Sequence, residues 1–287
     1  MSPRVSVIVP HYNDLVGLDA CLTSLERQTR RPDEVVVADN NSPQGEAEIA
    51  KVVARRARLT IVLEKGAGPA RNGGVAASTG DVLAFTDSDC LPEPEWLAAG
   101  LAALDTSDFA GGRMKVLVDD DQRMKPTEAF ECVFAFDNEA YVLRRGFTVT
   151  ANLFCSRKVF EAVGGFRVGV SEDADFCFRP REKGFRLGYA PSAVVGHPAR
   201  RTWSELLRKW RRLNAEGYEL EAERGRGGVP WAVKSLLMPV SAIAHTPKVL
   251  NSRAVPALAA KLGAIGVLYR LRLWRTWDSL RLLGTRE

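Results

Sequence analysis

Short apolar runs alternate with segments of helical periodicity over residues 5–104, and this alternation constrains the fold more than any other feature of the chain. The runs have the length of buried strands and lie at residues 5–9, 34–38, 59–63 and 82–85. The intervening and following patterns predict helices over residues 15–28, 47–58, 73–78 and 94–104. Because a strand, helix, strand order is typical of βαβ units, the sequence predicts an α/β fold with a mostly parallel central sheet flanked by helices.

Polar residues follow these apolar runs, where the strands of a parallel sheet would end together. They lie in four loops: Pro10 with His11, Tyr12 and Asn13; Asp39 with Asn40, Asn41 and Ser42; residues 66–72 with Arg71 and Asn72; and Asp87-Ser88-Asp89. Ligands of open α/β sheets bind beyond the carboxyl ends of the strands. An aromatic ring suits a base, a carboxylate suits a ribose hydroxyl, and a guanidinium suits a diphosphate. Together the loops predict a nucleotide pocket, although each loop alone is also typical of an ordinary turn.

The triplet Asp87-Ser88-Asp89 puts two carboxylates directly after the predicted strand at residues 82–85. Hard divalent cations take oxygen ligands and leave room for substrate phosphates. The triplet therefore predicts a site for a metal-bound diphosphate, and the alternative is a polar turn. The acidic run at residues 119–121 has no such context, and we interpret it as a solvated turn.

A second acidic segment, with Glu172 and Asp173, follows Gly164-Gly165-Phe166 and Ser171. One interpretation is an ordinary helix start, because Ser is a good N-cap and acidic residues favour the positive end of the helix dipole. The functional interpretation is a carboxylate base that takes a proton from an acceptor hydroxyl.

In the order in which they occur, these motifs resemble those of the family 2 glycosyltransferases of GT-A fold. The resemblance spans residues 4–198 and depends on Pro10 with Tyr12 and Asn13, Asp39, residues 70–73, Asp87-Ser88-Asp89, Asn152, residues 164–166, Glu172 with Asp173, and residues 179–184 before Pro191 and His197. It implies a Rossmann-like GT-A catalytic domain over residues 1–198. The implied reaction is the inverting transfer of a sugar from a nucleotide-sugar to an acceptor hydroxyl.

The resemblance implies which residues bind the donor. The nucleotide-sugar residues would be Pro10, Tyr12, Asn13, Asp39, Arg71, Asn72, Asp87, Ser88 and Asn152. Tyr12 and Asp39 would lie on the nucleobase side. Because His11 and Asn40 depart from the commonest family pattern, a UDP-sugar is the default donor and not an assignment.

The resemblance also implies the metal site and the catalytic acids. Asp89 would bind Mn²⁺ or Mg²⁺, and His197 would complete the metal site. Asp87 would take part in this site through a metal-bridging water, or would contact the ribose. Without the resemblance, a lone histidine at this position would be interpreted as a surface residue at a strand end. Asp173 would be the catalytic base, with Glu172 beside it to orient the acceptor or the helix. The presence of Pro180 in the segment 178–181 predicts an interruption of the helix there.

Residues 199–287 form a basic, apolar tail. Residues 197–287 carry 17 Lys or Arg against 7 Asp or Glu, whereas residues 1–196 carry 23 against 28. Residues 202–218 predict a basic amphipathic helix, and residues typical of a membrane interface follow at Arg270, Arg272, Trp274, Arg275 and Trp277. The apolar segments 229–244 and 255–269 are interrupted by Lys or Pro and are too short to span a bilayer.

We therefore expect the tail to associate with a membrane surface, and the alternative is a set of helices packed on the catalytic domain. Nucleic acid binding is disfavoured, because the basic residues alternate with Leu and Trp at helical spacing. A membrane-associated tail makes a lipid-linked or other saccharide acceptor plausible. The sequence lacks a Gln-x-x-Arg-Trp motif, which favours transfer of a single sugar.

Five scattered cysteines without a Cys-x-x-Cys pair predict reduced thiols, and no signal peptide is visible before the first predicted strand. We expect a cytoplasmic protein peripherally associated with the inner face of the cell membrane. The alternative functions are a sugar nucleotidyltransferase and a catalytically inactive, nucleotide-sugar-binding membrane scaffold.

Overall fold

The computed structural model describes residues 3–284, which form two compact units. The first unit consists of residues 3–115, 137–168 and 172–197, and the second of residues 116–136, 169–171 and 198–284. The last segment of the first unit ends one residue before the domain boundary predicted from the sequence. The segment 116–136 groups with the C-terminal helices, which no pattern in the sequence indicated.

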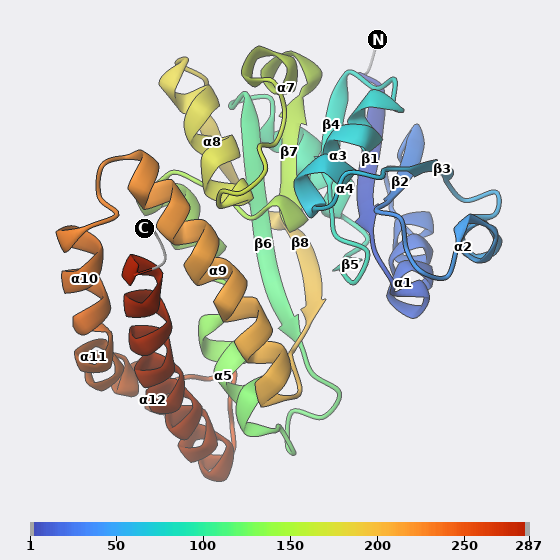
Figure 1. The fold of residues 1–287 in the computed structure, drawn as a ribbon. Coiled ribbons are helices and arrows are strands. Elements are labelled where there is room, and N and C mark those ends of the chain that lie inside the picture. The colour runs from blue at the N-terminus through green and yellow to red at the C-terminus, as the bar shows by residue number, and fades with distance from the viewer. Residues whose placement is uncertain (1–2, 285–287) are drawn as a thin grey trace. The chain divides into compact units, whose positions relative to one another are not determined.

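Within residues 3–284, eight strands form one sheet in the order β3-β2-β1-β4-β7-β6-β8-β5 (Figure 1). The strands are β1 (Val5–His11), β2 (Glu34–Asp39), β3 (Arg58–Ile61), β4 (Val82–Phe85), β5 (Leu91–Pro92), β6 (Phe109–Leu117), β7 (Leu153–Ser156) and β8 (Leu187–Pro198). β1 pairs in parallel with β2 and β4, and β2 with β3. β7 pairs antiparallel with β4 and β6, and β5 with β8. The predicted α/β fold is confirmed, and its sheet is mixed: the predicted parallel strands are extended by antiparallel ones.

The parallel strands form where the sequence predicts them, because they are apolar on both faces. Every residue of β1 and β4 is buried. The accompanying helices are α1 (Leu15–Glu26), α2 (Glu46–Val53), α3 (Ala67–Ala76) and α4 (Trp96–Ala103). α3 contacts β1 and β2 closely, and a Cβ at Gly74 would lie 2.6 Å from the Ile8 side chain. Glycine at this position therefore permits the close approach of helix and strand.

Aromatic side chains fill the core of the first unit next to the antiparallel strands. Phe85 from β4 packs edge-on against Phe166, with ring centroids 5.5 Å apart. Phe166 also stacks on Phe176, at 4.5 Å. Two helices follow this part of the chain, α7 (Arg157–Val163) and α8 (Glu172–Glu182). Pro180 lies inside α8, which ends two residues later, so the predicted interruption of the helix at this proline is wrong.

The sequence of residues 129–143 looks helical and partly apolar, but this segment is divided in the structure. α5 (Pro126–Phe134) ends first, and α6 (Asn138–Ala140) leads into the π-helical turn η1 (Tyr141–Arg145). Asp137 has φ −133° and its side chain accepts a hydrogen bond from the Ala140 N–H, at 3.4 Å. This new cap starts a second helix although the apolar spacing continues across the break. A 3₁₀ turn, η2 (Thr150–Asn152), precedes β7.

The second unit is helical. It contains α5, α9 (Trp203–Glu223), α10 (Val229–Leu236), α11 (Met238–Leu250), α12 (Leu258–Arg281) and the 3₁₀ turn η3 (Leu282–Gly284). The predicted amphipathic helix is confirmed as α9, which starts with a capping box between Thr202 and Glu205. Its Leu206 is buried in a core built from α5, α11 and α12. Among residues 3–284, no helix has the length and apolar character needed to cross a bilayer.

A buried carboxylate connects α5 to α9. Glu131 is 1% exposed, and its side chain accepts hydrogen bonds from Arg200 and from Lys209, both at 3.0 Å. Burial alone would raise the pKa of Glu131, but the charges of Lys209 and Arg200 outweigh burial and lower this pKa. The predicted solvated turn at residues 119–121 is confirmed, since all three aspartates are exposed.

Candidate functional site

A single arginine connects the residue that follows β4 to the start of α8. Arg71 donates from one terminal nitrogen to Asp87 Oδ1, at 2.6 Å, and from the other to Glu172 Oε2, at 2.7 Å. Arg71 is 4% exposed. Burial alone would lower the pKa of Arg71, but the negative charges of Asp87, Glu172 and Asp173 outweigh burial and raise this pKa. Arg71 therefore remains a cation, and its planar fork holds two acidic segments together.

Arg71 lies on a helix and not in a loop as the sequence predicted. α3 begins at Ala67, directly after Gly66 with φ 132°, and residues 66–72 supply its first two turns. Pro69 is accepted because the first turn of a helix does not need its N–H. The Gly68 N–H donates to Glu172 Oε1, at 2.9 Å. Glu172 thus joins the positive end of α3 to the start of α8.

The aromatic ring of Phe166 packs against the guanidinium of Arg71. The guanidinium carbon of Arg71 lies 5.7 Å from the centre of the Phe166 ring. The backbone of Phe166 is fixed by Asn72, whose amide donates to the Phe166 carbonyl and accepts from its N–H, both at 2.9 Å. Asn72, predicted to bind the nucleotide-sugar, uses its amide for this contact with the backbone.

Asp173 follows Glu172 on the first turn of α8 and is partly exposed. Its Oδ1 accepts two hydrogen bonds from Thr150, one from the backbone N–H at 2.9 Å and one from the hydroxyl at 2.7 Å. Among residues 3–284, Oδ2 of Asp173 accepts no hydrogen bond. One oxygen of this carboxylate is therefore fixed by Thr150.

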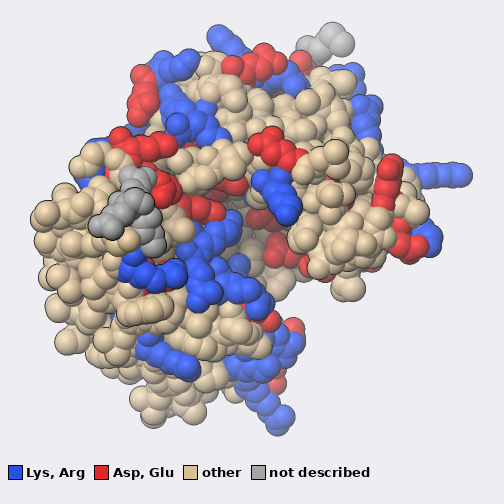
Figure 2. All heavy atoms as spheres, in the orientation of Figure 1, with Lys and Arg blue, Asp and Glu red and all other residues tan. Residues whose placement is uncertain are grey.

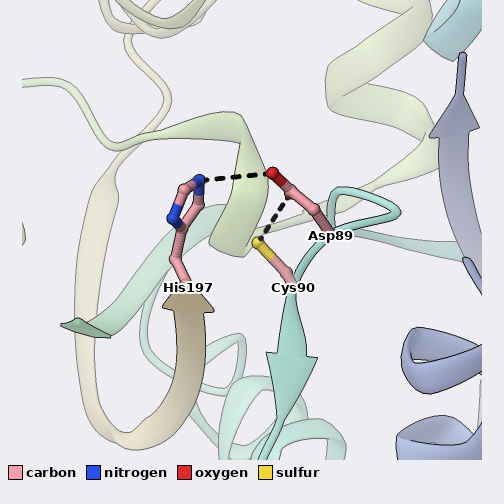
Figure 3. Close-up of side chains that lie close together, drawn as sticks. All are labelled: Asp89, Cys90 and His197. Carbon is pink, nitrogen blue, oxygen red and sulfur yellow. Dashed lines mark hydrogen bonds and ion pairs between the residues drawn. The ribbon is translucent and has the colours of Figure 1, made fainter. Parts of the chain in front are cut away.

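The residues Asp89, Cys90 and His197 form a second cluster, and each offers one ligand atom within 4.8 Å of the others (Figure 3). Asp89 Oδ2 lies 3.6 Å from His197 Nε2, and the Cys90 Sγ lies 3.7 Å from Asp89 Oδ1. The strand register brings them together: Leu91 of β5 pairs with Gly196 of β8, so the residues before and after this pair become neighbours. The expected proximity of Asp89 and His197 is found.

The cluster differs from the predicted metal site in two residues. Asp87, predicted as a ligand, is not in the cluster, and its Oδ1 contacts Arg71 instead. Cys90 is in the cluster and was not predicted, because the scattered cysteines indicate only reduced thiols. Burial, and then the Asp89 and Asp87 carboxylates, raise the pKa of Cys90 well above its usual value. Its position beside Asp89 was the available signal.

The predicted nucleobase side has one exposed and one buried member. Tyr12 is 60% exposed and presents its ring to solvent, whereas Asp39 is 1% exposed. Asp39 accepts hydrogen bonds from His11 Nδ1, at 2.7 Å, and from the N–H and hydroxyl of Ser42. His11 Nε2 accepts from the Asp14 N–H, at 3.2 Å, which assigns the ring proton to Nδ1. Asp39 thus organises the loops after β1 and β2.

The remaining predicted donor residues lie within β1 or shortly after β1 and β4. Asn13 has φ 57°, and its side-chain oxygen accepts from Gln44. Pro10 at the end of β1 and Ser88 between the two aspartates are buried.

Asn152 does not line the site, and this corrects its predicted contact with the nucleotide-sugar. Its side chain is 0% exposed. Its oxygen accepts from the Trp96 indole N–H at 2.9 Å, and its nitrogen donates to the carbonyls of Arg113 and Ala193. Asn152 therefore joins α4, β6 and β8 behind the site.

Comparison with known proteins shows the family. The chain matches the family described as Glycosyl transferase family 2 over residues 6–176. It is 32% identical over 217 residues to glycosyltransferase AglE of Haloferax volcanii. This alignment covers 72% of this chain and 70% of AglE. It has the same identity over 217 residues to the pre-mycofactocin glycosyltransferase of Mycobacterium tuberculosis, of which it spans 44%.

Solved structures with low sequence identity share the fold. A mannosyltransferase from Pyrobaculum calidifontis, PcManGT, in complex with GDP-Man and Mn²⁺, aligns with a TM-score of 0.64 at 19% identity, over 100% of this chain and 89% of that one. Glucosyl-3-phosphoglycerate synthase from Mycobacterium tuberculosis, in complex with Mn²⁺, UDP and phosphoglyceric acid, aligns with a TM-score of 0.53 at 19% identity, over 71% of this chain and 74% of that one. The solved structures and the sheet order show a GT-A fold, and the family match together with the identity to AglE establishes that the chain belongs to glycosyl transferase family 2 and is a glycosyltransferase.

Proposed function

We propose that this enzyme transfers one sugar from a nucleotide-sugar to an acceptor hydroxyl, with inversion at the anomeric carbon and with help from a divalent metal. The observation that carries the proposal is the double contact of Arg71 with Asp87 and Glu172. This contact joins the acidic triplet, where the donor diphosphate would bind, to the helix that carries Asp173. The proposed donor side and the proposed base are therefore parts of one site.

Asp173 is the proposed base. Its Oδ2 accepts no hydrogen bond within residues 3–284 and its Oδ1 is fixed by Thr150, so the carboxylate is oriented while one oxygen can take the proton of an acceptor hydroxyl. A base that activates the acceptor on the side of the sugar opposite to the leaving diphosphate gives direct displacement with inversion.

The donor set of the cluster fits a divalent cation. Asp89 supplies a carboxylate that is 45% exposed, and His197 supplies an imidazole nitrogen at 3.6 Å from it. Carboxylate and imidazole ligands suit Mn²⁺, and carboxylate with water suits Mg²⁺. A cation held by Asp89 and His197 would neutralise negative charge on the diphosphate as it leaves.

The nucleobase of the donor is inferred from the solved structures and from Tyr12. PcManGT binds GDP-Man, and the mycobacterial synthase binds UDP, so both nucleotides are compatible with this fold. Tyr12 offers an exposed ring for stacking on either base. We keep a UDP-sugar as the first donor to test.

Thermal-shift measurements against nucleotides and nucleotide-sugars, with and without Mn²⁺, identify the donor, because a ligand that binds only the native state raises its stability. A transfer assay with that donor should then release a nucleoside diphosphate and give a product of inverted anomeric configuration by NMR. Release of pyrophosphate from a nucleoside triphosphate and a sugar phosphate would instead identify a nucleotidyltransferase.

The variant Asp173→Asn should lower the transfer rate by about 10²–10⁴-fold while the metal-dependent thermal shift remains. Glu182→Gln, an exposed change on the same helix, is the matched control and should retain activity. An unchanged rate in Asp173→Asn would remove the residue from the proposed mechanism, and binding without turnover in the wild type would favour the inactive scaffold.

We further propose that the acceptor is lipid-linked and that the second unit binds the inner face of the cell membrane. Some of the residues that the sequence predicts at the membrane interface pack inside this unit instead. Trp274 packs against the core, and the guanidinium of Arg275 lies 3.9 Å from the centre of the Trp210 ring. Burial, and then the charge of Arg272, lower the pKa of Arg275 to about 9.

A different set of residues supports the proposed membrane contact. Large apolar side chains are exposed on α10, on α11 and at the residue between them, namely Val229, Val233, Leu236, Leu237, Val240 and Ile243. Others are exposed on α12, namely Leu258, Leu262, Leu273 and Trp277. Residues 224–277 contain nine Lys or Arg and no Asp or Glu, and the surface over α10 is largely tan (Figure 2). An apolar face accompanied only by cationic residues complements an anionic bilayer.

Vesicle sedimentation of the full chain tests this contact. The wild type should bind phosphatidylglycerol vesicles and bind phosphatidylcholine vesicles weakly, and Leu236→Asp with Ile243→Asp should lower affinity by at least about 10-fold. Leu63→Asp, at an exposed leucine of the first unit, is the control and should bind normally. Equal vesicle binding by the double variant and the control would contradict the proposal. It would also be contradicted if light scattering showed that the wild type is a dimer and that the double change makes it a monomer without changing vesicle binding.

A further inference from the structure

The cluster beside β5 contains a thiol that Mn²⁺ and Mg²⁺ do not need. Cys90 is fully buried, and its Sγ points to the space between Asp89 and His197 (Figure 3). A buried cysteine is in most proteins a small apolar residue. Here it is one of three potential ligands: Asp89 and Cys90 directly precede β5, and His197 lies on β8, which pairs with β5.

Two separations between these ligand atoms, each to a different oxygen of Asp89, match those of a tetrahedral zinc site. Zn²⁺ lies about 2.0–2.3 Å from nitrogen, oxygen and sulfur ligands, which separates neighbouring ligand atoms by about 3.3–3.7 Å. The cluster has 3.6 Å between His197 Nε2 and Asp89 Oδ2, and 3.7 Å between Cys90 Sγ and Asp89 Oδ1. All three ligand atoms lie within 4.8 Å of one another. A small rotation of the Asp89 carboxylate, which is 45% exposed, completes the geometry.

The donor types discriminate between metals. Carboxylate and water suit Mg²⁺ and Mn²⁺, imidazole suits Zn²⁺ as well, and a thiolate selects Zn²⁺ and other soft ions. At equal geometry, Zn²⁺ also binds more tightly than Mn²⁺. Three protein ligands and one open position are the arrangement of zinc sites that accept a further ligand.

We infer that Asp89, Cys90 and His197 bind Zn²⁺ through the carboxylate, the thiolate and the imidazole, and that Zn²⁺ at this position excludes the ion that works with the donor. The Cys90 thiol releases its proton to solvent as the sulfur–zinc bond forms. The binding step is independent of the reaction, whereas the exclusion rests on the function proposed above. Free Zn²⁺ is then an inhibitor of this enzyme that competes with Mn²⁺.

Binding is tested without donor or acceptor. Co²⁺ replaces Zn²⁺ as a spectroscopic probe, and a sulfur-to-cobalt charge-transfer absorption in the near ultraviolet reports the thiolate directly. The wild type should give this absorption, and Zn²⁺ should remove it. Its absence in the folded wild type would overturn the inference whatever the behaviour of any variant.

Calorimetric titration with Zn²⁺ then assigns the sulfur. Cys90→Ser should lower Zn²⁺ affinity by at least about 10–100-fold, the loss that follows removal of even an outer partner of a metal site. Cys132→Ser, at the half-buried thiol of α5, is the control for adventitious thiol binding and should leave the affinity unchanged. Equal affinities of the wild type and a folded Cys90→Ser would contradict the assignment.

A transfer assay tests the exclusion. Zn²⁺ should inhibit the Mn²⁺-supported reaction, excess Mn²⁺ should relieve the inhibition, and Cys90→Ser should require more Zn²⁺ for half-inhibition relative to its own uninhibited rate. Transfer supported by Zn²⁺ as well as by Mn²⁺ would overturn the exclusion. If no donor supports any transfer, the cobalt and calorimetric measurements still decide the metal site, so failure of the proposed function is distinguishable from failure of this inference.

Discussion

Thr150 holds Asp173 by donating two hydrogen bonds, from its backbone N–H and its hydroxyl, to the same carboxylate oxygen. Thr150→Val removes the hydroxyl and keeps the backbone donor. Since a hydrogen bond to a charged group contributes about 1.5–3 kcal/mol, we expect kcat to fall on the order of 10-fold with KM for the donor unchanged. Thr150→Ser retains the hydroxyl and should recover most of the rate. Steady-state kinetics that show equal losses in both variants would contradict this positioning role.

Arg71→Lys tests the connection between the triplet and α8. An ammonium group cannot contact Asp87 and Glu172 with the planar fork of a guanidinium. We expect the free energy of unfolding to fall by about 2–3 kcal/mol, less than for a fully buried ion pair because Asp87 is 32% exposed. Arg56→Lys is the control, because Arg56 pairs with an Asp19 that is 61% exposed. It should cost less than about 1 kcal/mol in urea denaturation, and a similar cost for the two variants would refute the argument.

Asn152→Leu separates a structural role from a binding role. The change leaves the Trp96 indole N–H and the carbonyls of Arg113 and Ala193 without their partner. At about 1–3 kcal/mol for each buried unpaired group, unfolding free energy should fall by about 3 kcal/mol or more. The exposed change Asn251→Ala should cost less than about 0.5 kcal/mol. A stable Asn152→Leu variant that has lost donor affinity would restore the contact predicted from the sequence.

The lowered pKa of Glu131 makes the free energy of unfolding depend on pH in the acid range. Its folded-state pKa lies below the ordinary 4.5, so its contribution is complete above pH 4.5 and is lost as the pH falls through the folded value. The unfolding free energy of the wild type should therefore decline more steeply on acidification below pH 4.5 than that of Glu131→Gln. Glu48→Gln, at an exposed pair with Lys51, should run parallel to the wild type. Parallel curves for Glu131→Gln and the wild type would be inconsistent with the lowered pKa.

The parallel half of the sheet could be predicted from the sequence because its strands are continuous apolar runs. β4 was predicted residue for residue, and β1 and β2 extend the predicted runs by one or two residues. β6 was not predicted, since its residues Phe109–Leu117 include two glycines and two cations and give no regular pattern. The start of α3 was missed for a related reason: Gly66, Gly68 and Pro69 are typical of loops, and only packing reveals that a helix tolerates them.

Several predicted site residues lie at or directly after the ends of β1, β2 and β4, but their contacts depend on partners far away in the chain. Asn152 looks like a polar ligand in the sequence because nothing there indicates the indole of Trp96. Cys90 lies in a cluster of potential metal ligands with His197, and only the pairing of β5 with β8 brings the two together. Neither relationship has a local pattern that periodicity could detect.

The pairing of Leu91 with Gly196 has a consequence for how this enzyme would fail. β5 consists of two residues, and a slip of one position would turn every side chain along it to the opposite face of the sheet. β5 is an edge strand that pairs with β8, so such a slip would keep the order of the other strands while it separates the proposed cation ligands. Damage at this edge would therefore be detected as a metal-binding defect long before any loss of secondary structure.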